Sequence, residues 1–97
     1  MRPSEVLELK REAIREATKR FNAANPRVFG SVARGEDGPE SDIDILVDAL
    51  PGSTLLTLGG LQDALEQMFD GIRVDVVTSG GLPDLIKKRV LAEARAI

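Results

Sequence analysis

The segment FGSVARGEDGPESDIDILVD, residues 29–48, decides the fold and carries much of the chemistry of this chain. Its final part, residues 42–47, alternates acidic and branched apolar side chains, which predicts a β-strand. Side chains alternate between the two faces of a strand, so Asp42 and Asp44 would share one face. They would lie roughly 7 Å apart, at about 3.3 Å per residue. The opposite face can pack against helices through three branched residues: Ile43, Ile45 and Val47.

Two carboxylates on one strand face repel each other, and partial burial makes that arrangement less favourable still. A cation removes the penalty, and in a chain without His or Cys a hard ion held by oxygen is the natural candidate. Mg²⁺ typically binds one or two carboxylates together with substrate phosphates. Taken singly, such aspartates are more typical of the wet face of an edge strand, where they aid solubility. Their surroundings favour the metal site.

Asp75 supplies a third carboxylate, because it interrupts the apolar run of a further expected strand, residues 72–77. Val74 and Val76 would occupy one face of that strand and Asp75 the other. If this strand lies beside residues 42–47, Asp75 can point toward Asp42 and Asp44. Read alone, it also fits an exposed position.

Gly30 and Ser31 follow a short strand candidate, residues 27–29, and lie shortly before the acidic pair. Glycine permits close approach of the backbone to a ligand, and a helical turn beginning at Ser31 would point free N–H groups at an anion. A Gly-Ser pair alone is usually a routine turn. Its position predicts a phosphate-binding turn that meets the aspartates at one end of the sheet.

Two polar residues of this segment, Arg34 and Ser41, each have two possible roles. Arg34 either contacts phosphate or braces the acidic cluster, or it simply pairs with Glu36 or Asp37. Ser41 contacts substrate or, more in keeping with its place after a Gly-Pro turn, fixes that turn. Glu40 belongs to the turn by composition. We expect Asp48 to be a solvated group at the strand end, and we expect the KKR run, residues 87–89, to lie on a wet helix face.

Helices alternate with the strands. We expect a first helix over residues 4–20, capped by Ser4. Its inward positions should be Val6, Leu9, Ala13, Ala17 and Phe21. The outer side should carry the pairs Glu8–Arg11, Glu12–Arg15 and Glu16–Arg20. NAANP, residues 22–26, should end this helix.

Further helices are expected over residues 54–69 and from Pro83 to about Arg95. The order α-β-β-α-β-α predicts one α/β (α+β) domain over residues 1–97, with a small mixed sheet and flanking helices.

Composition narrows the possible chemistry. The chain has no His and no Cys, which excludes imidazole bases, His- or Cys-ligated zinc and disulfides. Its net charge of −3 argues against direct nucleic-acid binding. No stretch approaches the roughly 20 apolar residues of a membrane span, and no secretory leader opens the chain. We therefore expect a cytoplasmic protein without membrane contact.

The motif GSVARGEDGPESDIDILV, residues 30–47, resembles the signature of the polymerase-β-like nucleotidyltransferase superfamily. The later VDVV strand and the closing helix extend the likeness over nearly the whole chain. It is most similar to the minimal nucleotidyltransferases (MNT) that act as antitoxins to HEPN toxins. The resemblance implies the polymerase-β-like fold, with Gly30 and Ser31 at the phosphates of ATP. It also implies Mg²⁺ on Asp42, Asp44 and Asp75, with Asp75 accepting the proton of the incoming hydroxyl.

Some members of that group transfer AMP from ATP to a tyrosine of the partner toxin, which is protein adenylylation. This chain has no tyrosine, so a tyrosine acceptor must belong to another chain. Two other functions remain open from the sequence. The domain could neutralise a toxin by binding alone, or it could modify RNA ends or a small molecule. The intact motif argues against the first, and the lack of a second domain argues against the second.

Overall fold

The computed structural model describes residues 1–97. Its elements run in the order α1 (Pro3–Arg20), β1 (Ala23–Phe29), β2 (Ile43–Ala49), α2 (Leu55–Met68), β3 (Val74–Thr78), the 3-10 turn η1 (Ser79–Gly81), α3 (Asp84–Glu93) and β4 (Arg95–Ala96). The expected α-β-β-α-β-α order is confirmed. None of the helices combines the length and the apolar character that crossing a bilayer requires.

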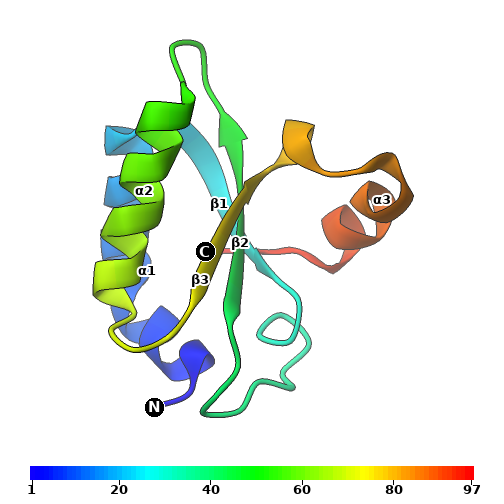
Figure 1. The fold of residues 1–97 in the computed structure, drawn as a ribbon. Coiled ribbons are helices and arrows are strands. Elements are labelled where there is room, and N and C mark those ends of the chain that lie inside the picture. Colours follow the sequence, from blue (N-terminus) through cyan, green and yellow to red (C-terminus); the bar gives the residue numbers. More distant parts are fainter.

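The strands form one mixed sheet in the order β3-β2-β1-β4. β2 and β3 run parallel, because α2 carries the chain back between them, while β1 is antiparallel to both β2 and β4. α1 and α2 lie together on one face of the sheet, and α3 lies on the other (Figure 1). The end of β1 and the starts of β2 and β3 therefore meet at one end of the sheet.

The main core lies between the sheet and the helix pair. Ile43, Ile45 and Val47 are fully buried there, as the strand alternation predicts, together with Leu61 and Leu65 of α2. The opposite face of β2 carries Asp44, Leu46 and Asp48. Leu46 is also fully buried, and the buried Val90 of α3 lies outside the main core as well. The second face thus has a much smaller apolar contact than the first.

The inward face of α1 matches the expected one in part, since Val6, Ala17 and Phe21 pack on the core. Leu9 is 72% exposed and Ala13 is exposed, whereas Leu7 and Ile14 are buried beside Ala17. The helix carries two overlapping apolar stripes, and the neighbouring surfaces of β1 and α2 select the second. The ion pairs Glu8–Arg11 and Glu12–Arg15 form as expected, whereas Glu16–Arg20 does not.

The start of α1 corrects a second expectation. Ser4 does not cap the helix; it lies inside the first turn, and its backbone N–H donates to Asp37 Oδ2 at 2.9 Å. Asp37 comes from the loop between β1 and β2 and is only 6% exposed. Burial would raise the pKa of the Asp37 carboxyl, but hydrogen bonds from Ser4 outweigh it, so the pKa is lowered. An ionised Asp37 therefore holds the loop against α1.

The structure also differs from the expected elements at residues 22–26 and at the C-terminus. α1 ends at Arg20 and Asn22 takes a left-handed φ of 59°, but the rest of NAANP belongs to β1. A register shift between Ala24 and Arg27 accommodates Pro26 as a bulge. The last helix ends at Glu93 rather than near Arg95, and Arg95–Ala96 forms β4, which the helical expectation missed.

Two side chains explain how α2 sits on the sheet. Gly60 lies against the ring of Phe21, since a Cβ at this position would stand 2.6 Å from Phe21 Cε1. The adjacent Gly59 has no neighbour within 4 Å of the same position. Gln62 bonds both Val74 O and Val76 N, so its amide takes the place of a further strand along the free edge of β3. The first contact packs α2 against the end of α1, and the bonds of Gln62 join α2 to β3.

The glycine pair makes a first prediction. Gly59→Ala should stabilise the protein by up to about 1 kcal/mol, because alanine favours the helix and fits into open space. Gly60→Ala should destabilise it by about 1 kcal/mol or more, because overpacking against Phe21 exceeds that gain. Urea unfolding of both variants measures the difference. Equal urea midpoints for the two variants would show that the packing against Phe21 does not require glycine at position 60.

The buried carboxylate makes a second prediction. Asp37→Ala should lower the free energy of unfolding at pH 7 by about 0.5–2 kcal/mol, the usual effect of losing a helix cap. The folded-state pKa of Asp37 is depressed, so its contribution exists above the ordinary value of 3.8 and is lost as the pH falls through the folded value. The wild type and the variant should therefore converge in acid. A difference that stays constant from pH 7 to pH 3 would contradict this account, and Glu36→Ala is the exposed neighbouring control.

Candidate active site

The parallel register of β2 and β3 brings the acidic residues together. Asp44 pairs directly with Asp75, as Ile43 pairs with Val74. Paired residues of neighbouring strands project to the same face, so the two carboxylates lie side by side on the face opposite the main core. Asp44 and Asp75 are half-buried, whereas Asp42 precedes β2 and is exposed.

Electrostatic strain concentrates on Asp44. Burial raises the pKa of its carboxyl, and the charges of Asp75 and Asp42 raise it further, with Arg34 partly offsetting them. None of the ion pairs of the protein includes Asp42, Asp44 or Asp75. This contrasts with Asp37, whose burial is balanced by hydrogen bonds. A half-buried carboxylate with acidic neighbours and no partner is characteristic of a functional site.

The donor chemistry fits a hard divalent cation, because every candidate ligand is a carboxylate. No group of three acidic side chains converges closely enough in the structure to form a finished metal centre. Like charges stand apart when nothing neutralises them. The backbone register supplies the neighbouring strand positions of Asp44 and Asp75, and the assignment of all three aspartates as ligands stays a prediction.

Gly30 stands directly against this pair. It follows Phe29, which is the β1 partner of Asp44, and has a φ of +71°. A Cβ on Gly30 would approach Asp44 Oδ2 to 2.4 Å, so no other residue fits without displacing the carboxylate. The backbone then makes a single turn in which Arg34 N bonds Gly30 O and Glu36 N bonds Ser31 O. The turn thus begins where β1 ends, next to Asp44.

Arg34 takes part in a contact that the sequence did not suggest. Its Nη1 donates to Glu93 Oε1 at 2.6 Å, and its Nε lies 3.5 Å from Glu36 Oε2. Glu93 Oε2 also accepts from the backbone N–H of Gly30 at 3.1 Å. The one available signal was that Glu93 is acidic in the last turn of α3, where the helix dipole disfavours a negative charge.

Ser41 shapes the turn before Asp42. Its Oγ accepts from Gly38 N at 2.8 Å, and its own N–H donates to Gly38 O at 3.1 Å. The turn-fixing reading is therefore confirmed for this residue. A contact of Ser41 with nucleotide stays a prediction.

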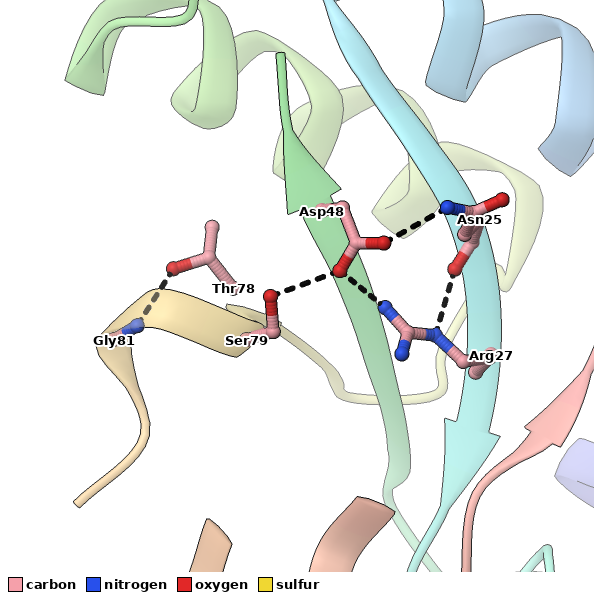
Figure 2. Close-up of polar contacts among 6 residues, drawn as sticks. All are labelled: Asn25, Arg27, Asp48, Thr78, Ser79 and Gly81. Atoms are coloured by element: carbon pink, nitrogen blue, oxygen red, sulfur yellow. Dashed lines mark hydrogen bonds and ion pairs between the residues drawn. The ribbon is translucent and has the colours of Figure 1, made fainter. Parts of the chain in front are cut away.

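Asp48 corrects the expectation of a solvated strand end. Its carboxylate accepts from Asn25 at 2.8 Å, Arg27 at 2.6 Å and Ser79 at 2.8 Å (Figure 2). The bond from Asn25, followed by those from Ser79 and Arg27, lowers the pKa of Asp48 despite some burial. Nearby, Thr78 Oγ1 accepts from Gly81 N and caps η1. The network ties the far ends of β1, β2 and β3 together, four residues along β2 from Asp44.

A cleft of about 550 Å³ opens beside the turn that begins at Gly30. It separates the end of β1 from α3. Its lining consists of Phe29, Gly30, Arg34, Ile86, Arg89, Val90 and Glu93. Arg89 thus places one residue of the basic KKR run at the cleft rather than on a purely solvated surface. A second cavity, of about 460 Å³ near the C-terminus, contains none of the predicted site residues.

Comparison with known proteins identifies the class. Residues 10–97 match the model of the nucleotidyltransferase domain family. Protein adenylyltransferase MntA of Thermococcus cleftensis is 42% identical over 79 residues, which are 81% of this chain and 79% of that protein. A proposed protein adenylyltransferase of Methanocaldococcus jannaschii is 46% identical over 67 residues, 69% of this chain and 71% of its own length.

Solved structures agree on the fold. A structure described as a proposed minimal nucleotidyltransferase superposes with a TM-score of 0.86 at 44% identity, over 97% of this chain and 95% of that one. A toxin–antitoxin structure with AMP-PNP gives a TM-score of 0.73 over 88% of this chain and 69% of that one. At 22% identity it supports the fold alone.

The chain belongs to the nucleotidyltransferase domain family and to its minimal nucleotidyltransferases. It is a nucleotidyltransferase enzyme, and the resemblance seen in residues 30–47 is confirmed. The expected small mixed sheet with flanking helices is confirmed as well.

The strain on Asp44 predicts a trade-off between stability and site chemistry. The raised folded-state pKa means that ionising Asp44 destabilises the fold as the pH rises above the ordinary value of 3.8. Asp44→Asn removes this charge, so the variant should unfold at a higher temperature than the wild type at pH 7 and at a similar temperature near pH 3. Thermal unfolding at both pH values measures this. A variant less stable than the wild type at pH 7 would show that Asp44 is not strained.

Proposed function

We propose that this chain is a Mg²⁺-dependent protein adenylyltransferase that transfers AMP from ATP to a hydroxyl of a cognate toxin. The observation that carries the proposal is the placement of Asp44 beside Asp75, with Gly30 packed against Asp44. This puts a candidate metal site and a candidate phosphate site in contact. Relatives at 42% and 46% identity that bear the name protein adenylyltransferase support the reaction class.

Each residue has a role in this scheme. Asp42, Asp44 and Asp75 would hold one or two Mg²⁺ ions. Such ions neutralise charge on the phosphates and favour ionisation of an attacking hydroxyl. Gly30 and Ser31 would bind the phosphates of ATP through backbone N–H groups and the serine hydroxyl, with Arg34 beside them.

The transfer itself needs few protein groups. The acceptor oxygen forms a bond to the α-phosphorus of ATP, and the bond from that phosphorus to the bridging oxygen breaks, so pyrophosphate leaves. Asp75 accepts the proton of the hydroxyl. Positioning and charge neutralisation supply most of the rate. This explains how a chain without histidine can perform the reaction.

The acceptor must come from a partner. We infer a tyrosine of a HEPN-type toxin from the family resemblance, and because this chain contains no tyrosine, such an acceptor must belong to another chain. The toxin–antitoxin structure with AMP-PNP shares this fold and is consistent with such a pairing. Because the donor is ATP, we place the reaction in the cytoplasm.

The metal assignment predicts the outcome of a transfer assay. Asp42→Asn, Asp44→Asn and Asp75→Asn should each reduce the transfer of labelled AMP to the co-purified partner at least about 100-fold, because each removes charge complementary to the transition state. Asp63→Asn, on the exposed surface of α2, is the matched control and should retain activity. Chelation of divalent ions should abolish labelling by the wild type.

Two results would overturn this function. Labelling that persists in the double variant Asp42→Asn/Asp44→Asn would remove the aspartates from the metal site. A wild type that suppresses the toxin without transferring any AMP would favour neutralisation by binding alone.

A further inference from the structure

The carboxylate of Glu93 occupies two hydrogen-bond donors of the phosphate-binding turn. Oε2 accepts from Gly30 N at 3.1 Å, and Oε1 accepts from Arg34 Nη1 at 2.6 Å. The antiparallel register of β4 on β1 produces this contact. Arg95 pairs with Val28, and the same register continued by two residues sets Glu93 opposite Gly30.

The position is unfavourable for an acid unless those donors are present. Glu93 ends α3, where the helix dipole repels negative charge. It also contributes to the raised pKa of Asp44. Arg34 first, and Gly30 N–H after it, lower the pKa of Glu93 and keep it ionised. The Glu93 side chain is 22% exposed and that of Arg34 is 47% exposed, so solvent reaches the pair mainly from the arginine side.

The two donors are the kind that bind phosphate. An N–H at a glycine turn and a guanidinium are the usual partners of phosphate oxygens. A carboxylate presents two anionic oxygens and can therefore take the place of one edge of a phosphate group. The cleft of about 550 Å³ beside Gly30 and Arg34 leaves room for a larger anion on the same donors.

We propose that Glu93 is a built-in competitor of the nucleotide: it occupies Gly30 N–H and Arg34 in the free protein, and the phosphate tail of the nucleotide displaces it. This rests on the proposed function only in assigning the turn to phosphate. Displacement frees Arg34 for the phosphates and removes a negative charge from the vicinity of Asp44. It also releases the end of α3, so nucleotide binding is coupled to the position of that helix.

Binding of inorganic tripolyphosphate and of a non-hydrolysable ATP analogue, measured by calorimetry, tests the proposal. Glu93→Gln and Glu93→Ala should bind both probes roughly three- to tenfold more tightly than the wild type, the size expected for removing one ion pair and one amide hydrogen bond. Glu93→Gln retains the size of the side chain, which protects the test against a local collapse of α3. Glu36→Gln is the matched control, because Glu36 also lies near Arg34 but makes no contact with Gly30.

A competing role and a positioning role of Glu93 predict opposite changes in the affinity for the phosphate probes. If Glu93 instead positions Gly30 and Arg34 for phosphate, both variants should bind the probes more weakly, and the proposal is wrong. If Glu36→Gln tightens binding as much as Glu93→Gln, the effect comes from the loss of any negative charge near Arg34, and the proposal is wrong. A Glu93 variant with unchanged affinity, in a protein that still transfers AMP, would refute the competitor and leave the proposed function intact. Failure of every variant and of the wild type to bind either probe would refute both.

Discussion

The site depends on the parallel pairing of β2 with β3, which sets two carboxylates side by side. Asp44 and Asp75 repel each other, since the charge of Asp75 raises the pKa of Asp44; two unit charges near a protein surface interact by roughly 4 kcal/mol or less at separations of about 4 Å or more. The opposite face of the same strand buries Ile43, Ile45 and Val47 completely. Each such side chain contributes about 1.5–3 kcal/mol on burial. The aliphatic core therefore outweighs the repulsion and keeps the two strands in register.

The two faces of the sheet are stabilised differently. α1 and α2 cover the first face with an extensive aliphatic core, whereas α3 reaches the second face with Val90 as its one buried residue. Leu85 of α3 is 97% exposed. α3 therefore depends on its polar end, through Glu93, and on the short β4 that follows it. An element held by few apolar contacts is the natural part of the molecule to shift when a ligand enters.

The acidic residues whose pKa departs from the ordinary value do so in opposite directions. Asp37, Asp48 and Glu93 have lowered pKa values because N–H, O–H and guanidinium groups surround them. Asp44 has a raised pKa and no such partner. No buried side-chain polar atom of the protein is left without a hydrogen bond. A half-buried carboxylate with a raised pKa and no ion pair is therefore found only at the candidate site, at Asp44.

The sequence alone determined the order of the main elements, the face of β2 that enters the core and the residues of the nucleotidyltransferase motif. These properties depend on local periodicity and turn chemistry, which lie within a few neighbouring residues. Only the tertiary structure decided that Asp37 caps α1, that Leu7 rather than Leu9 faces inward, and that Asp48 joins β1 and β2 to η1. It alone set Glu93 against Gly30, because β4 is too short to show in any local pattern. Contacts between residues 21 to 63 positions apart depend on strand register and helix rotation. Register and rotation are settled by packing against other elements, which a local pattern does not contain.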